Sequence, residues 1–461
     1  MTELTSLTIS QAAKLMSSGE LSPVELTHAF LDRIGRLDPQ LNSFITVTAE
    51  AALEQAKQAE ANFRNGNYLD ILHGIPLAVK DLFALKGTVT TAGAKAYSTA
   101  VETADCAVVA TLRKAGATFL GKTNMHEYAF GVINDNPHFG TCRNPWDSNR
   151  SPGGSSGGNG AALSADLCMG ALGSDTRGSI RIPAALCGIV GLKPTIPAVN
   201  LDGVVTLSWS LDHTGPMART VEDVAVLYMH LTNGYRLREL TMNPTEPLQS
   251  LRIGVPADDF FREADPEIIA AFDAAIGVFA GLGAKIVPVN LNFLRETVET
   301  SKVIVSADAA AFHRERLEQQ PEQFGADVLA RLRLGQQYTG VDYALARRAQ
   351  RLLFLQFYDL FQRDPDKPDN LHVLLTPTTP VVAPRLDDAA ELDTARTRLS
   401  WFTAPFNMTG NPAISVPCGF TRSGLPIGLQ IITRYSGEST LLYAAYAYEQ
   451  ATDWHTRKPA L

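Results

Sequence analysis

Three short stretches hold residues that could break a covalent bond: a lysine after an apolar run, and two loops rich in Gly and Ser. Lys80 follows the apolar residues 75–79 and precedes Asp81. Because burial lowers the pKa of an amine, a lysine at the end of a buried strand is either paired and within reach of water or a neutral general base. Pairing with Asp81 is the more common arrangement, and Lys80 alone does not decide between the two.

The two loops supply hydroxyl groups and backbone freedom. In residues 151–160, SPGGSSGGNG, glycines flank Ser155 and Ser156 and permit unusual backbone angles. A flexible linker is the alternative, but apolar helical sequence follows at once. Residues 173–181, GSDTRGSIR, place Ser179 ahead of a second apolar run. A loop of this kind can direct several backbone N–H groups at one point, as an oxyanion hole requires.

Other catalytic motifs are absent or out of context. Residues 116–123 match the phosphate-binding pattern G-x-x-x-x-G-K-[ST]. Here, however, a helix precedes the first glycine and a strand lies inside the motif, the reverse of the order that such a loop needs. No histidines are spaced H-x-x-x-H, and no G-x-S-x-G segment supports a Ser-His-Asp triad, so His126 and His213 are expected to be loop or core residues. We expect no metal and no organic cofactor.

Composition narrows the class of protein. The 461 residues are 45% hydrophobic and 19% charged, which is typical of a globular chain with a sizeable core. With 40 Lys and Arg against 48 Asp and Glu, the formal charge of −8 argues against nucleic acid or an anionic membrane as the main partner. No apolar run approaches the roughly 18 residues of a membrane helix. The five cysteines are scattered and the start shows no signal-peptide pattern, so we expect reduced thiols and a cytoplasmic protein.

Apolar runs and turn residues indicate the elements that must position these loops. From about residue 71, short apolar runs alternate with helical stretches, which predicts an α/β protein. The strand candidates are residues 75–79, 117–120, 251–255, 285–289, 372–375, 413–416 and 427–432.

We expect one domain over residues 1–461, and it divides into four parts. A helical segment over 1–65 precedes the catalytic core, 70–240. A mostly helical cap over 257–363 is expected to cover a sheet that 370–461 completes. The Arg-rich run 347–351 within the cap is predicted to be a solvated helix face.

The longest motif resembles a known family. Residues 173–195, GSDTRGSIRIPAALCGIVGLKPT, follow the GGSSGG core of the first loop, and this order is similar to the amidase signature family. The similarity covers nearly the whole chain and is nearest to bacterial amidases and to the A subunit of the tRNA-dependent amidotransferase. It implies a large, mixed, twisted β-sheet sandwiched between α-helices. Other matching segments are residues 74–81, 121–125, 143–146, 212–216 and 412–419.

The resemblance also implies catalytic roles. Ser179 corresponds to the nucleophile of the family's Ser–cis-Ser–Lys triad, Ser155 to the serine in a cis peptide, and Lys80 to the base. Neutral Lys80 would take the proton of Ser179 through the Ser155 hydroxyl while Ser179 attacks a carbonyl carbon. The resulting acyl-enzyme would then be hydrolysed by water.

Further residues are carried over from the same comparison. Backbone N–H groups of the second loop match the oxyanion hole, three residues match positions that brace the loops, and four match the segment that faces the acyl group. An apolar or aromatic substrate is therefore expected. These three sets are Thr176, Arg177, Gly178 and Ser179; Ser156, Asp175 and Arg181; and Tyr128, Ala129, Phe130 and Gly131.

Two positions depart from the family pattern. Arg177 stands where the family usually has glycine. It either points to solvent or braces a loop, or it clamps a substrate carboxylate or carbonyl or narrows the pocket. Ser400 stands where the A chains of amidotransferases carry an acid, just before the Phe402-Thr403 pair, and that acid binds the amino group of glutamine. Its absence argues against free glutamine as the substrate.

We therefore expect an amidase that acts on a small-molecule amide, with aryl amides, esters and carbamates (urethanes) all within reach of the same chemistry. Two alternatives remain. One is the glutamine-hydrolysing component of a tRNA-dependent amidotransferase, which works only with partner chains. The other is a catalytically silent binding module, against which the intact serines and lysine argue. A monomer or a homodimer is expected.

Overall fold

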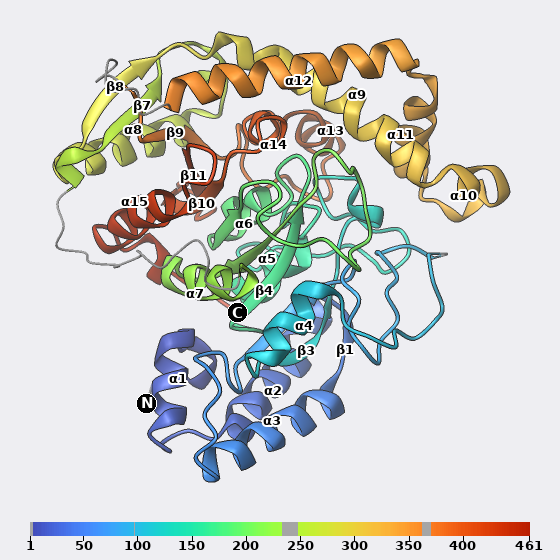
Figure 1. Cartoon of the computed structure of the whole chain (residues 1–461), viewed down its shortest axis with the longest axis vertical. Coiled ribbons are helices and arrows are strands. Elements are labelled where there is room, and N and C mark those ends of the chain that lie inside the picture. Colours follow the sequence, from blue (N-terminus) through green and yellow to red (C-terminus); the bar gives the residue numbers. More distant parts are fainter. Residues whose placement is uncertain (1–2, 96, 233–247, 362–369) are drawn as a thin grey trace.

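One mixed sheet runs through the molecule and carries the residues of interest at its strand ends. The computed structural model describes residues 3–95, 97–232, 248–361 and 370–461 (Figure 1). Within these ranges eleven strands form one sheet in the order β1-β3-β2-β4-β6-β5-β10-β11-β9-β7-β8. The strands are β1 Phe44–Val47, β2 Pro76–Lys80, β3 Thr118–Thr123, β4 Gly170–Asp175, β5 Val190–Lys193, β6 His213–Ala218, β7 Arg252–Pro256, β8 Lys285–Val289, β9 Val373–Pro377, β10 Ala413–Phe420 and β11 Pro426–Thr433.

Helices cover both faces of this sheet. Strands β2, β4, β6 and β11 are buried at every position, and successive residues of a strand point to opposite faces, so each face must be covered. Both α6 and α15 contact β10 and β11. The helices are α1 Ile9–Ser17, α2 Pro23–Leu41, α3 Ala49–Arg64, α4 Ala107–Lys114, α5 Gly157–Ser164, α6 Arg181–Cys187, α7 Val221–Leu231, α8 Pro266–Gly281, α9 Arg295–Phe312, α10 Arg314–Gln319, α11 Ala326–Gln337, α12 Gly340–Phe361, α13 Ala389–Arg398, α14 Ala404–Met408 and α15 Glu438–Gln450. The predicted α/β class, with a large mixed sheet between helices, is confirmed.

The direction of three central strands brings the two Gly/Ser loops to the lysine. Strand β2 lies between β3 and β4 and runs parallel to both. The carboxyl ends of all three strands therefore meet at one edge of the sheet, where parallel strands commonly place functional groups. Lys80 ends β2 and Asp175 ends β4 at this edge.

The sequence pattern predicted the strands that are mainly apolar, and it missed strands that contain many glycines or polar residues. All seven predicted strands are present, with ends shifted by up to four residues. The segment 1–65, predicted to be helical, contains β1, a four-residue strand paired antiparallel with β3. Strands β4, β5 and β6 were not predicted, because their glycines, polar residues and Pro216 break the apolar pattern. Residues 173–175, expected in a loop, are the end of β4.

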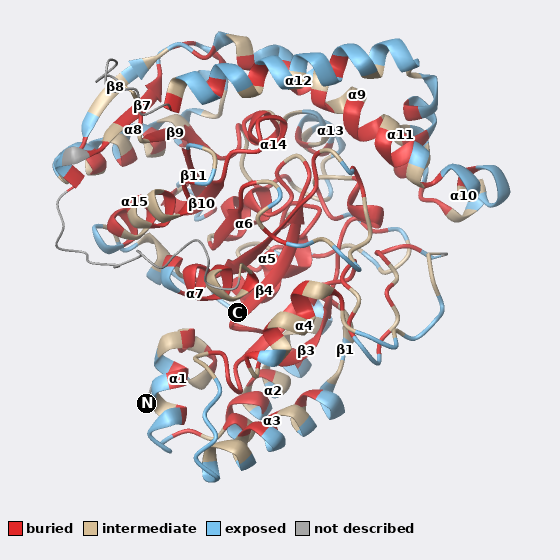
Figure 2. Cartoon of the chain, in the orientation of Figure 1, coloured by how far each residue is buried: buried red, intermediate tan, exposed pale blue. Residues whose placement is uncertain are grey.

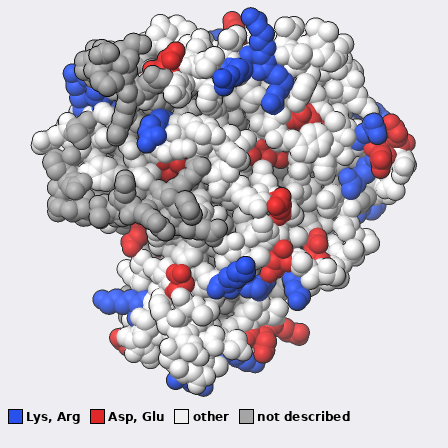
Figure 3. All heavy atoms as spheres, viewed as in Figure 1, with Lys and Arg blue, Asp and Glu red and all other residues white. Residues whose placement is uncertain are grey.

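The cap lies along one side of the molecule. Helices α11 and α12 both pack on α9 at the top of Figure 1, and Figure 2 shows α9 largely buried while α12 exposes its outer face. Arg347, Arg348 and Arg351 are exposed on α12, as the predicted solvated face requires. The predicted boundaries at 240 and 363 lie outside the described residues. On the face drawn in Figure 3, basic and acidic side chains of the described residues are interspersed.

Close approach of β1 to β3 requires a glycine. Gly121 has a φ of +154°, and a Cβ there would lie 2.1 Å from the Thr46 carbonyl oxygen. We expect Gly121→Ala to lower the free energy of unfolding by about 2 kcal/mol or more, since backbone rather than a flexible side chain must move. The measurement is the urea midpoint. Gly277→Ala is the matched control, because Gly277 lies inside α8 with open space around its Cα. There the urea midpoint should rise, because the free energy of unfolding increases by about 0.5–1 kcal/mol. Equal shifts in the two variants would contradict the prediction.

Candidate active site

Lys80 is buried at the end of β2 and faces serines rather than its neighbouring acid. Its Nζ donates hydrogen bonds to Ser155 Oγ at 2.6 Å and to Ser174 Oγ at 2.9 Å, and the side chain is inaccessible to solvent. Asp81 follows on the opposite face and instead pairs with Lys122 Nζ at 2.8 Å. The pairing of Lys80 with Asp81, which the sequence left open, therefore does not occur.

Burial changes the protonation of this lysine. It lowers the pKa of the Lys80 amine to about 7, against the opposing effect of the Asp175 and Asp212 carboxylates. An ordinary lysine would be fully charged at neutral pH. Here a substantial fraction of the amine is neutral and can accept a proton.

The two Gly/Ser loops are joined to each other at the lysine. The peptide bond between Gly154 and Ser155 is cis. The Ser156 N–H donates to the Ser179 carbonyl oxygen at 3.3 Å, and Ser156 Oγ donates to the Ser174 carbonyl oxygen at 3.3 Å. Ser155 and Ser156 are fully buried, whereas Ser179 retains 6% exposure and lines a pocket. The structure thus gathers Lys80, Ser155 and Ser179 at one edge of the sheet.

The second loop is folded around a buried ion pair. Arg181 Nη2 lies 2.9 Å from Asp175 Oδ1, and Arg181 Nε lies 3.0 Å from Asp175 Oδ2. The remaining guanidinium donors reach the Thr403 carbonyl at 3.0 Å and the side-chain oxygens of Gln430 at 2.5 Å and Asn407 at 2.7 Å. Burial pushes the pKa of the Asp175 carboxyl upward, but Arg181 holds it below its ordinary value.

The Asp175 carboxylate also binds backbone N–H groups of its own loop. It accepts from Gly178 N at 2.7 Å and from Ile180 N at 3.2 Å. Gly178 N–H is therefore not free to serve as an oxyanion donor, which corrects the expectation drawn from the resemblance. Thr176, Arg177 and Ser179 line the pocket, and their N–H groups have no acceptor in the part of the chain that the structure describes. Three donors, not four, remain available.

The pocket combines the second loop with the segment 129–132 and with the cap. Tyr128, predicted to contact the substrate, does not line it: its ring packs on His313 at 4.3 Å and on Phe324 at 5.4 Å, between centroids. Ala129, Phe130 and Gly131 do line it, and their contact with a substrate stays a prediction. The lining residues are Ala129, Phe130, Gly131, Val132, Thr176, Arg177, Ser179, Leu207, Lys302, Val305, Ser306, Arg331, Leu334 and Arg396.

The cap is held on this segment by polar contacts. Glu127 Oε2 accepts from Gly325 N at 2.9 Å, and His126 Nε2 lies 3.0 Å from Asp327 Oδ2. The Arg331 guanidinium hydrogen-bonds the Phe130 carbonyl oxygen.

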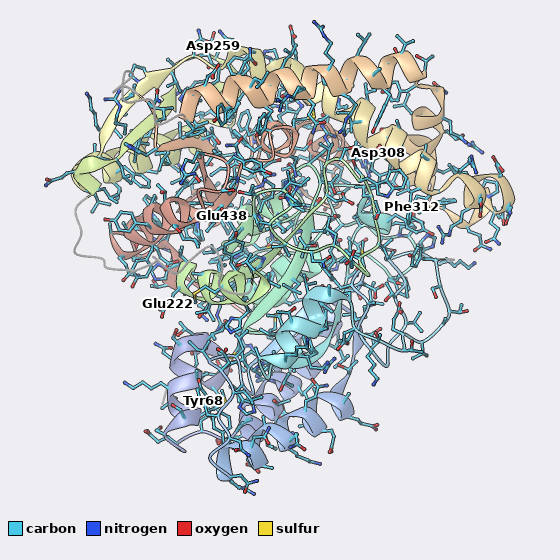
Figure 4. All side chains as sticks on the ribbon, in the orientation of Figure 1. Tyr68, Glu222, Asp259, Asp308, Phe312 and Glu438 are labelled. Atoms are coloured by element: carbon cyan, nitrogen blue, oxygen red, sulfur yellow. The ribbon has the colours of Figure 1, made fainter. Side chains whose placement is uncertain are left out.

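A further contact fixes α9, which carries Asp308 and Phe312 in Figure 4. Asp308 accepts from Ser208 Oγ at 2.5 Å and from Tyr343 OH at 2.8 Å. Helix α9 is thereby tied to the loop before β6.

Sequence reasoning missed two kinds of site residue. Ser174, a hydrogen-bond partner of Lys80, lies in the same loop motif as Asp175 and would follow from recognising β4 as a strand next to β2. The other residues carry no local signal: Lys302 and Arg331 of the cap and Arg396 of the C-terminal part reach the pocket only through the packing of α9, α11 and α13.

Metal ligation and membrane insertion find no support among the described residues. No group of three or more His, Cys, Asp and Glu side chains lies close enough there to hold a metal ion. None of the described helices combines the length and apolar character that a membrane crossing demands. His126 and His213 are buried, and all five cysteines are free and buried.

The buried ion pair leads to a stability prediction. In Arg181→Met the Asp175 carboxylate stays buried without its partner, so we expect the free energy of unfolding to fall by about 3–5 kcal/mol. Folding lowers the pKa of Asp175 in the native protein, so the stability that this carboxylate contributes is present above its unfolded pKa and is lost as pH falls through its folded pKa.

In Arg181→Met the buried Asp175 carboxyl takes up a proton more readily. The stability difference between the variant and the native protein should therefore become smaller toward about pH 5. Urea midpoints at two pH values measure both effects. Adding Asp175→Asn should restore part of the loss, and a deficit that is the same at both pH values would contradict the account.

Comparison with known proteins agrees with this geometry. The family model described as Amidase matches residues 25–442. The chain is 39% identical to the A chain of the glutamyl-tRNA(Gln) amidotransferase of Chloroflexus aggregans, with 100% of this chain and 99% of that protein covered. Among solved structures, a protein described as an amidase superposes with a TM-score of 0.87 at 32% identity, covering 96% of this chain and 99% of the other.

A third similar protein comes from a vestigial complex that reveals the evolutionary origins of an s-triazine catabolic enzyme. It superposes with a TM-score of 0.88 at 31% identity, covering 96% of this chain and 98% of the other. The family model spans most of the chain, and both structural matches cover 96% of it. The chain belongs to the amidase signature family of carbon–nitrogen hydrolases and amidotransferases.

Proposed function

We propose that the chain hydrolyses the C–N bond of a carboxamide through an acyl-enzyme on Ser179. One observation carries the proposal: a buried amine, Lys80, whose pKa lies at about 7, hydrogen-bonds Ser155 at 2.6 Å beside the pocket that Ser179 lines. An amine that is partly neutral at physiological pH can act as a base where an ordinary lysine cannot.

The reaction proceeds in two balanced halves. Ser179 Oγ attacks the carbonyl carbon while its proton passes through the Ser155 hydroxyl to Lys80 Nζ. The N–H groups of Thr176, Arg177 and Ser179 stabilise the oxyanion. The C–N bond then breaks, and the leaving nitrogen takes the proton back from Lys80. Water attacks the acyl-enzyme by the same proton route, which releases the acid and restores Ser179.

The pocket walls favour an acyl group with apolar surface. Phe130, Val132, Leu207, Val305 and Leu334 contribute apolar side chains around Ser179. Apolar walls with a few polar groups bind ligands of matching shape. Aryl amides therefore suit the pocket, and esters and carbamates share the same tetrahedral chemistry.

Glutamine hydrolysis within a tRNA-dependent amidotransferase is a second candidate, favoured by the name of the 39% identical relative. In that role the chain would depend on partner chains and tRNA. Ser400 stands at the position of the acid that binds the glutamine amino group, and it is buried, with its carbonyl oxygen accepting from Thr403 Oγ1 at 3.3 Å. No acidic residue lines the pocket in the described part of the chain. A cationic amino group has no counter-charge there, which supports the free-standing hydrolase.

The role of Lys80 predicts the pH profile. Because only the neutral amine accepts a proton, kcat/KM should rise with pH and level off above about 7. We expect Lys80→Met to lower kcat/KM by about 10²–10⁴-fold and to remove the rise of kcat/KM with pH. Lys86→Met, which removes the same charge from an exposed lysine, should keep the native profile. A rate that is flat between about pH 5 and pH 9 in the native protein would contradict a lysine base.

Turnover by the purified single chain distinguishes the two candidates. We expect hydrolysis of an anilide and an aryl carbamate, but not of glutamine, measured as released amine or ammonia. Ser179→Ala should abolish turnover, because the hydroxyl is the nucleophile, and Ser164→Ala, a buried serine outside the pocket, should keep it. Glutamine turnover alone, or activity that needs partner chains, would establish the amidotransferase role instead. Retained activity in Ser179→Ala would overturn the assignment.

A further inference from the structure

The pocket that Ser179 lines holds four basic side chains: Arg177, Lys302, Arg331 and Arg396. Three of them have a carboxylate partner outside the lining. The pairs are Lys302–Glu299 at 2.5 Å, Arg331–Asp327 at 3.6 Å and Arg396–Asp393 at 2.9 Å.

Arg177 differs from these three because it has no such partner. Its Nε donates to Ser301 Oγ at 3.0 Å and its Nη2 to the Val298 carbonyl oxygen at 3.4 Å, both neutral groups on α9. Within the described ranges the guanidinium forms no ion pair, and its other N–H groups have no protein acceptor. A guanidinium carries five N–H donors in a fixed fork, so the greater part of this fork is unused.

The surroundings of Arg177 are unfavourable for a cation. Burial lowers the pKa of Arg177 to about 10, with Glu299 opposing this effect and the neighbouring Arg331 adding to it. Arg177 is only partly buried, so a carboxylate that enters the pocket can reach its guanidinium and replace the water that is lost there. Because the other three basic side chains already have carboxylate partners, Arg177 is the group in the pocket that would favour an anion.

The position of Arg177 connects this charge with the reaction. It lies two residues before the nucleophile Ser179, and its side chain shares the pocket with Phe130 and Val132 of the segment matched to the acyl group. A planar guanidinium binds a carboxylate through two parallel hydrogen bonds, which orients as well as attracts it.

We propose that Arg177 binds a carboxylate on the acyl group of the substrate, so that the preferred substrates are monoamides of dicarboxylic acids without a nearby ammonium group. This inference rests on the proposed amide hydrolysis. The reaction consumes water and yields the dicarboxylate and the free amine. Glutamine fits poorly, because its ammonium group would enter the same basic pocket.

Matched substrates separate recognition of the charge from recognition of the chain. The mono-4-nitroanilides of succinic and glutaric acid carry the carboxylate, and the 4-nitroanilides of butyric and valeric acid have the same carbon counts without it. Released 4-nitroaniline measures kcat/KM for each. We expect the native chain to prefer the anionic member of each pair by at least about 10-fold, since hydrogen bonds to charged groups contribute strongly to binding.

Substitutions test whether Arg177 is the source of this preference. In Arg177→Gln the anionic-to-neutral ratio of kcat/KM should fall by about 10–100-fold, mainly through KM, and Arg177→Lys should recover part of it. Any effect of the substitution on the loop itself affects both substrates and cancels in the ratio. Arg333→Gln removes the same charge from an exposed position on α11, and Ser301→Ala removes only the Nε contact. Both should keep the native ratio.

A binding measurement makes the inference independent of turnover. Titration calorimetry with glutarate should detect binding to the native chain that Arg177→Gln weakens and Arg333→Gln does not. Two results would overturn the inference while amide hydrolysis stands: an anionic-to-neutral kcat/KM ratio near one in the native chain, or an equal loss of kcat/KM for both substrates in Arg177→Gln. Arg177 would then serve only to hold its loop against α9. Absence of any turnover together with Arg177-dependent glutarate binding would overturn the proposed function and leave the carboxylate site.

Discussion

The site depends on one interaction, the buried ion pair between Asp175 and Arg181. The two carboxylate oxygens bind the guanidinium and the N–H groups of Gly178 and Ile180, and these bonds hold the loop between β4 and α6 in its shape. The other guanidinium donors reach Thr403, Gln430 and Asn407 and tie this loop to the C-terminal part of the chain. A buried ion pair contributes little net stability, so its role here is to specify geometry.

A second constraint is that only one of two neighbouring buried lysines, Lys122 and not Lys80, forms an ion pair among the described residues. Asp81 pairs with Lys122, and Lys80 instead hydrogen-bonds the hydroxyls of Ser155 and Ser174, with the Asp175 and Asp212 carboxylates acting on it without a hydrogen bond among the described residues. Alternation along the strand end separates adjacent residues onto opposite faces, so residues 80 and 81 cannot share one partner. Hence the same sheet edge carries one stable ion pair and one amine whose pKa lies at about 7.

The pocket is completed by parts of the chain far from its loops. Residues of α9 and α11 in the cap, and of α13 in the C-terminal part, complete a pocket whose other walls come from the loop after β4 and from the segment 129–132. Polar contacts of Glu127 and His126 hold α11 against the segment that lines the pocket. The apolar walls and the basic side chains thus come from parts of the chain far apart in sequence, and under the proposed hydrolysis they would select the acyl group.

The sequence by itself determined the α/β class and the family. It also pointed to Lys80, Ser155 and Ser179, because they stand in motifs whose order and spacing are specific; their catalytic roles stay a prediction. Other features were decided only in the tertiary structure. They are the strands β1, β4, β5 and β6, the hydrogen bond that occupies the Gly178 N–H, the packing of Tyr128 on His313, and the basic side chains of the pocket. Each depends on contacts between segments distant in sequence: a short strand is stabilised by its partner, an N–H group is taken by whichever acceptor folds against it, and a pKa is set by burial. The local sequence pattern does not specify strand partners, hydrogen-bond acceptors or the burial of a titratable group.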